Sequence, residues 1–171
     1  MYISISPRVE RVLSQITVGC LNYEASVKPT KAGALCGAES AAQVCGMSRA
    51  AFLAIAIWGG FSKLSDIQEL KGFLMRDVVM KSNWFCTSTY LSDLSYRQKV
   101  DGLVLGAIAH LAHNEKTIKA AIYAERMGIT RRGFNKTWQR RLPAIQDRLM
   151  FLLMIAADKI NAAGANGCIK H

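Results

Sequence analysis

The stretch Ala120–Arg141, AAIYAERMGITRRGFNKTWQRR, predicts two helices joined by a tight turn. Gly128 stands where the chain must turn, and glycine readily adopts the left-handed backbone conformation that such a turn requires. The hydroxyl group of Thr130 can cap the second helix. Ala124 and Phe134 supply a small and a large apolar side chain where the two helices meet. The stretch therefore predicts a helix-turn-helix unit.

The second of these helices is strongly basic. Between Arg126 and Arg141 the chain carries six basic residues and no acidic residue. Such side chains bond phosphate oxygens and the edges of guanine and adenine. The sequence therefore predicts a DNA-binding surface, and the alternative is an ordinary solvated basic helix. The residues expected to face the DNA are Thr130, Arg131, Arg132, Asn135, Lys136, Gln139, Arg140 and Arg141.

The composition favours a polyanionic partner. The chain has 171 residues, of which 51% are apolar, and a formal net charge of +10. Such a charge attracts nucleic acid or an anionic membrane surface. The longest apolar runs, 50–58 and 149–157, are about half as long as a bilayer span requires. The first residues also lack the features of a secretory signal. We therefore expect a cytoplasmic protein that binds double-stranded DNA and no membrane.

Helical periodicity runs through almost the whole chain and predicts a compact all-α protein. We expect a helical scaffold half over 1–82, a DNA-binding half over 90–163 and a frayed tail over 164–171. Helices are expected at 7–22, 39–45, 48–58, 64–80, 90–113, 117–127, 130–141 and 143–162.

The two halves share a short sequence pattern. Residues 46–52 read GMSRAAF and residues 128–134 read GITRRGF, so both have glycine, an apolar residue, a hydroxyl residue, arginine and a final phenylalanine. Either the motif is duplicated, with a degenerate first copy, or two amphipathic helices are alike by chance. The helix Ala50–Trp58 that follows the first copy is apolar on all sides, which predicts that it is buried. We therefore assign nucleic-acid binding to the second occurrence of the pattern, at residues 128–134.

The sequence gives no indication of catalysis. It has no phosphate-binding glycine loop and no acidic cluster suited to a metal ion. Its five cysteines are scattered, and a zinc site from His110, His113 and the tail would require the tail to fold back. Gly102 and Gly106 are expected to let helices pack closely. We predict no enzymatic activity, no catalytic residues, no cofactor and no metal.

Three motifs follow one another in the second half: D-G-L-V-L at 101–105, M-G-I-T at 127–130 and W-Q-R-R at 138–141. In this order, over about residues 100–158, the chain resembles the late-gene antitermination Q proteins of lambdoid phages, in the small class without zinc. Those proteins carry a D-G-L helix, a helix-turn-helix, an aromatic residue with flanking arginines and a long closing helix. Many of them have a longer segment between the first two elements, and the first half of this chain has no counterpart among them.

The resemblance implies an adaptor that binds DNA beside a phage late promoter. It would load onto a bacterial RNA polymerase paused downstream, let it read through terminators and catalyse nothing itself. The polymerase contact is expected at Trp58–Phe61 or around Trp84–Phe85, although these aromatics can equally be core residues. Two other functions stay open: a dimeric helix-turn-helix repressor or activator, and a basic helical module, such as a toxin or inhibitor, that binds an acidic protein surface.

Overall fold

The computed structural model describes residues 46–60, 62–113 and 120–165, and within these ranges it is all-α, as predicted. The helices expected at 7–22 and 39–45 lie outside the described residues. In chain order the elements are α3 (Arg49–Trp58), α4 (Leu64–Leu74) with its π-helical continuation η1 (Met75–Val79), α5 (Thr87–Ser92), α6 (Leu94–His113), α7 (Ala120–Arg126), α8 (Arg131–Gly133) with its π-helical continuation η2 (Phe134–Trp138), and α9 (Leu142–Ala165).

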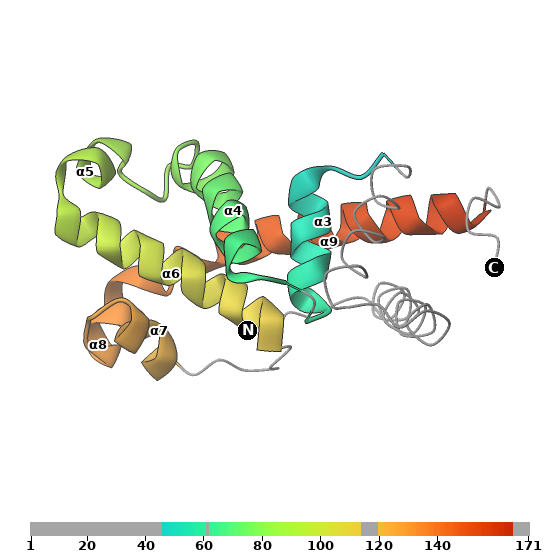
Figure 1. The fold of residues 1–171 in the computed structure, drawn as a ribbon. Helices are drawn as coiled ribbons and strands as arrows, with labels where there is room; N and C mark the ends of the chain where they lie inside the picture. The colour runs from blue at the N-terminus through green and yellow to red at the C-terminus, as the bar shows by residue number, and fades with distance from the viewer. Residues whose placement is uncertain (1–45, 61, 114–119, 166–171) are drawn as a thin grey trace.

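The long helix α9 passes α3 and projects beyond it toward the C-terminus, whereas α5, α7 and α8 lie at the opposite end of the molecule (Figure 1). Helix α3 packs across α9, and α6 lies against both of them. Helix α4 covers α3 and α6. Apolar side chains from these helices form one buried cluster, in which Leu53, Leu103 and Leu153 are fully buried. The described helices of the two predicted halves therefore share one core.

Helix α3 occupies the centre of this core. Ser48 caps it, because its Oγ accepts a hydrogen bond of 3.3 Å from the backbone N–H of Ala51. Every residue of 50–54 is buried, as are Ala56 and Ile57. The prediction that the apolar helix 50–58 is buried is therefore confirmed, and its side chains hold α4, α6 and α9 together.

Ion pairs join the helices at the edge of the core. The Arg49 side chain of α3 lies 2.9 Å from Glu69 of α4, and Arg148 of α9 lies 2.7 Å from Asp77 of η1. Lys71 of α4 lies 2.7 Å from Asp101 of α6. The hydrogen bond from Arg148 holds the pKa of the Asp77 carboxyl below its ordinary value. These pairs fix how α4 and η1 lie against their neighbours.

Three predicted helix boundaries were wrong. The helix expected at 90–113 is interrupted at Asp93, whose carboxylate accepts hydrogen bonds from the backbone N–H groups of Ser95 and Tyr96 and so caps α6. The helix expected at 130–141 ends at Trp138, and residues 139–141 form a turn before α9 begins at Leu142. Helix α9 continues past the predicted tail boundary to Ala165, and residues 166–171 lie outside the described part.

No helix in the described ranges combines the length and the apolar character that crossing a lipid bilayer demands.

Candidate nucleic-acid interface

Helices α7 and α8 are joined by a turn whose hydrogen bonds account for its sequence. Gly128 has a φ of +63°, in the left-handed region that favours glycine. Its N–H bonds the carbonyl of Glu125 at 3.0 Å, and the N–H of Ile129 bonds the carbonyl of Ala124 at 2.9 Å. These two bonds form a Schellman motif, which ends α7. The predicted turn at Gly128 is confirmed.

The next helix begins at a capping residue. Thr130 has an extended backbone, and its Oγ1 accepts a hydrogen bond of 3.1 Å from the N–H of Gly133. The predicted cap at Thr130 is therefore confirmed. That this helix pair is a DNA-binding helix-turn-helix stays a prediction.

Aromatic stacking holds the two helices together. The rings of Tyr123 and Phe134 are stacked, with centroids 5.3 Å apart, and both side chains are buried. Ala124 is also buried, as a close approach of two helices requires. The hydroxyl of Tyr123 lies 3.4 Å from Nδ1 of the buried His110, and burial raises the pKa of the Tyr123 hydroxyl. Tyr123 thus serves as a core residue of the helix pair.

Two glycines of α6 let α7 lie directly on it. A Cβ atom at Gly102 would come within 2.7 Å of the Arg126 carbonyl oxygen, and one at Gly106 within 2.6 Å of the Tyr123 ring. Real Cβ atoms essentially never come this close to such atoms, so a larger residue at either position would force the neighbouring atoms of α7 to shift. The predicted close packing at Gly102 and Gly106 is confirmed. Helix α6 is therefore the platform that positions the basic segment.

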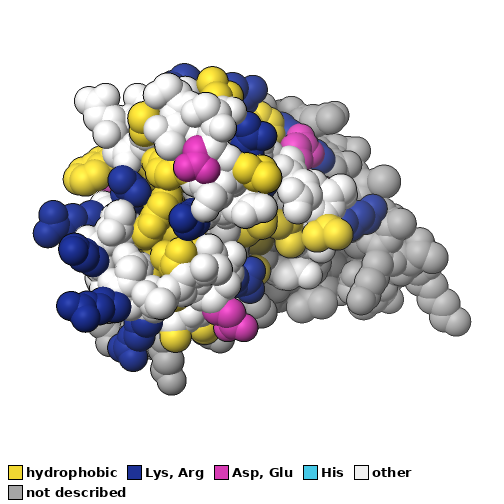
Figure 2. Space-filling view, turned by 90° about the vertical axis from the view of Figure 1, so that its left-hand side faces the viewer, with side chains coloured by type: hydrophobic (Ala, Val, Ile, Leu, Met, Phe, Trp, Pro, Cys, Tyr) yellow, Lys and Arg dark blue, Asp and Glu magenta, His cyan; other side chains and the backbone are white. Residues whose placement is uncertain are grey.

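The predicted DNA-facing residues all belong to one surface segment, but they are not on one regular helix. Thr130 is the cap, Arg131 and Arg132 open α8, and the last three follow η2 in a turn. Figure 2 shows Lys and Arg side chains gathered along one edge of this end of the molecule. The exposed members are Thr130, Arg131, Arg132, Asn135, Lys136, Gln139 and Arg140, whereas Arg141 is half-buried.

The charges on this surface are not neutralised locally. Within the part of the chain that the structure describes, no carboxylate forms an ion pair with Arg131, Arg132 or Lys136. The Arg141 guanidinium instead lies over the Trp138 ring, 4.6 Å from its centroid. Arg49, at the matching position of the similar segment 46–52, is paired with Glu69. The segment Thr130–Arg141 therefore presents positive charge to solvent, which suits it to bind a polyanion.

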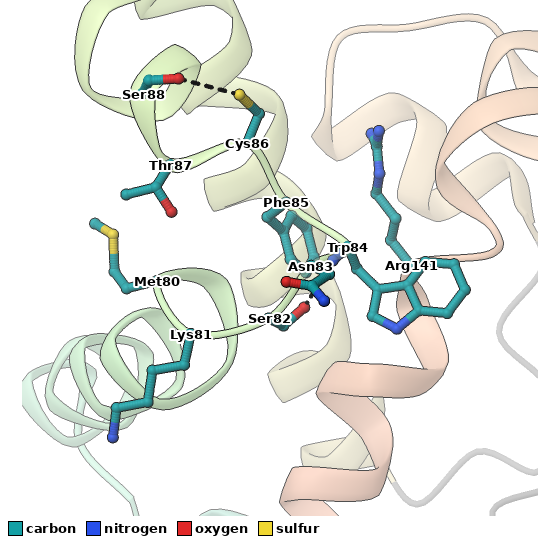
Figure 3. Close-up of a pocket in the computed structure, with 10 residues that line it drawn as sticks. All are labelled: Met80, Lys81, Ser82, Asn83, Trp84, Phe85, Cys86, Thr87, Ser88 and Arg141. Atoms are coloured by element: carbon teal, nitrogen blue, oxygen red, sulfur yellow. Dashed lines mark hydrogen bonds between the residues drawn. The ribbon is translucent and has the colours of Figure 1, made fainter.

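The fold brings a second segment to this surface. The loop between η1 and α5 approaches the turn after η2, and the two enclose an open hollow of about 390 Å³. A neighbouring hollow of about 600 Å³ extends along the loop to Ser88 and also reaches Arg141 (Figure 3). The smaller hollow is lined by Asn83, Trp84, Lys136, Thr137, Arg140 and Arg141.

Of the aromatic residues expected to contact a partner, some are exposed in the structure and others are buried. Trp84 is exposed over 54% of its surface, whereas Phe85 is buried and belongs to the core. Trp58 is half-buried, and Phe61 lies outside the described residues. The sequence did not associate Asn83 and Trp84 with the basic segment, because the two segments are about fifty residues apart and neither contains a motif that predicts their contact.

Neither a metal site nor a similar known protein helps to identify the function. Within the described ranges, no three His, Cys, Asp or Glu side chains come together as a metal site. No protein-family model, curated protein or solved structure matches the chain. Its function is therefore inferred from the chemistry of its own residues.

Proposed function

We propose that this chain is a sequence-specific regulator of transcription that binds double-stranded DNA through Thr130–Arg141. The observation that carries the proposal is a capped turn followed by basic side chains that are exposed and free of carboxylate partners within the described residues. A duplex offers phosphates at regular spacing along both strands, so several such side chains can bind at once. A solvated surface helix would ordinarily intersperse acidic residues, and this segment has none.

The side chains divide by position into two roles. Arg131 and Arg132 stand at the start of α8, the end at which recognition helices meet base edges in the major groove. Asn135 and Lys136 follow them on the exposed side of η2. Arg140 stands beyond the helix, where a contact with phosphate is expected. Base reading is thus assigned to the first four positions and backbone contact to the last.

The more specific function that we propose is antitermination. The resemblance of the second half to phage Q proteins supports an adaptor that holds DNA and bacterial RNA polymerase together. An adaptor needs a second surface for the polymerase. Exposed apolar side chains are available on other elements: Phe151 and Met154 on α9, and Leu91 and Leu94 around the start of α6.

Transcription with purified components tests this function. A template with a late promoter, the cognate binding site and a downstream terminator is transcribed by bacterial RNA polymerase with and without the protein. Antitermination predicts longer transcripts that depend on both the protein and the DNA site. A block to initiation would instead identify a repressor. A chain that binds no duplex DNA, and whose binding to a partner protein is indifferent to competitor DNA, would be a protein-interaction module.

The same assay separates loading from polymerase contact. The double variant Arg131→Ala/Arg132→Ala should abolish read-through at the cognate site. In a pulldown it should still bind polymerase, because the polymerase surface lies on other residues. Arg49→Ala is the matched control, since Arg49 has the equivalent place in the first copy but is paired with Glu69. It should keep its read-through activity.

A further inference from the structure

We propose that the hollow between Trp84 and the basic turn binds an unpaired nucleotide, so that the protein recognises single-stranded nucleic acid adjoining a duplex. The base would stack on the Trp84 indole, and its phosphates would meet Arg140 and Arg141. This inference rests on the proposed DNA-binding function of the same surface and extends it to melted segments.

The residues that line the smaller hollow are of the kinds that bind single strands. One large aromatic side chain, Trp84, is more than half exposed, although tryptophan ordinarily buries most of its surface. Three basic side chains line the same hollow, and no acidic side chain lines either hollow. Asn83 adds an amide that can bond a base edge. Proteins that bind single strands combine an aromatic platform with a basic groove in this way.

The loop that carries Trp84 is held in place by its neighbours. The backbone N–H of Trp84 bonds Ser82 Oγ at 3.0 Å, and Phe85 is anchored in the core. The N–H of Cys86 bonds the hydroxyl of Tyr96 at 3.2 Å. These contacts place the indole without burying it, so a base that stacks there meets a prepared surface.

The same contacts continue to the basic turn. The centroids of the Tyr96 and Trp138 rings lie 5.5 Å apart. The Arg141 guanidinium lies over the Trp138 ring of this pair. The Trp84 loop and Arg141 are therefore fixed to one aromatic pair, although they are distant in the sequence. Figure 3, which draws the larger hollow, shows Trp84 and Arg141 on the same side of it, while Lys81 points away from them.

An unpaired nucleotide fits this geometry better than a base pair. In a duplex, neighbouring bases cover each other's faces, and an indole ring can contact them only at their edges. An unpaired base exposes its face and can stack on tryptophan whatever its identity. The basic turn then holds the strand by its phosphates while duplex DNA occupies the α8 side of the surface.

Binding of two DNA probes tests the inference. The first is a blunt duplex with the cognate site, and the second is the same duplex with an overhang of about eight thymidines, within the range of known single-strand sites. We expect the overhang to tighten binding of the wild-type chain by about fivefold or more, the factor that corresponds to the lower end of base–aromatic stacking. Trp84→Ala should lose this gain and keep its affinity for the blunt duplex. Trp84→Phe should retain most of the gain.

A matched control removes another exposed aromatic side chain. Phe151 of α9 is 49% exposed and lines neither hollow, so Phe151→Ala should bind the two DNA probes as the wild type does. A uridine overhang distinguishes the source of the strand, because an equal gain indicates that the site accepts RNA and DNA, and a smaller gain that it favours DNA. As a second readout, an unlabelled thymidine oligonucleotide should quench tryptophan fluorescence in the wild type and not in Trp84→Phe.

The outcomes separate this inference from the proposed function. If the blunt duplex binds and the overhang adds nothing, or if Trp84→Ala keeps the gain, the inference is wrong and duplex binding stands. If only the overhang probe binds and Trp84→Ala abolishes that binding, the single-strand site is supported and the duplex function is wrong. A chain that binds neither probe contradicts both.

Discussion

Arg49 and Arg131 occupy the same position after two glycines with the same backbone φ, but the structure gives them opposite surroundings. Each follows a hydroxyl residue that caps its helix, and the glycines that precede them, Gly46 and Gly128, both have a φ of +63°. Arg49 is bound by Glu69 and lies over the Phe52 ring. Arg131 is exposed and has no carboxylate partner within the described residues.

This difference predicts different effects of the two arginines on DNA binding. Arg131→Ala or Arg132→Ala should each cost about 1–3 kcal/mol of binding free energy and relax the preference at one base pair. Arg140→Ala should weaken all sequences alike, since it removes a phosphate contact. Competition assays against a set of single-base-pair variants of the site measure both effects.

Arg49→Ala is the control for that experiment and should leave affinity and preference unchanged, because Arg49 is already neutralised by Glu69. If Arg131→Ala and Arg132→Ala both leave sequence preference untouched, these two residues do not read bases.

The glycines of α6 yield a second prediction. Gly106→Ala would place a Cβ within 2.6 Å of the Tyr123 ring, so it should lower the free energy of unfolding by about 1–3 kcal/mol. Gly72 of α4 is exposed, with no atom within 4 Å of the position of its Cβ. Gly72→Ala should therefore raise stability by up to about 1 kcal/mol, through helix propensity alone. Urea denaturation compares the two, and equal stability of Gly106→Ala and wild type would contradict the packing of α7 on α6.

The buried helix α3 provides a third prediction. Phe52 is buried, and its truncation to alanine should open a cavity that costs about 3–5 kcal/mol of stability. Phe151→Ala, at an exposed position, should cost less than about 1 kcal/mol. Thermal denaturation gives the Tm of each variant. A Phe52→Ala chain with an unchanged Tm and no DNA binding would mean that α3 faces the nucleic acid.

A fourth prediction concerns the pH dependence of Cys86. Hydrogen bonds with the Ser88 and Thr89 hydroxyls lower the pKa of this exposed thiol to about 7. Because the thiolate is the reactive form, alkylation of Cys86 by iodoacetamide should reach half its maximal rate near pH 7. Mass spectrometry of the peptide that contains Cys86 measures the rate.

Thr89→Val removes a hydroxyl donor and should move the midpoint upward, whereas Thr89→Ser keeps the donor and should leave it in place. A wild-type midpoint near the ordinary value of 9 would show that these hydroxyls do not stabilise the thiolate.

The features that sequence predicted well are those that depend on neighbours along the chain. Gly128 and Thr130 define a turn and a cap whose hydrogen bonds all fall within a few residues, and the all-round apolar character of 50–58 specifies burial wherever that helix packs. The end of the basic helix at Trp138 is not among them, because Pro143 predicts only that the chain breaks before α9.

The part that sequence did not predict depends on tertiary packing. Trp84 joins the basic surface because Cys86 bonds Tyr96, and Tyr96 packs on Trp138. Tyr96 and Trp138 are far apart in the sequence, so no short sequence motif contains both of them. The interruption at Asp93 has a local cause, because Asp93 caps the helix that follows it. The sequence did not predict this interruption, because the helical periodicity continues on both sides of Asp93.

The salt dependence of duplex binding tests the account most directly. If about five basic residues between Arg126 and Arg141 lie close enough to neutralise phosphates, those that also read bases included, a plot of log affinity against log salt concentration should have a slope of roughly −4 to −5. Arg140→Ala, which removes a phosphate contact, should reduce the magnitude of that slope by about 1, and Arg49→Ala should leave it unchanged. A flat response to salt in the wild-type chain would contradict the claim that Thr130–Arg141 binds DNA.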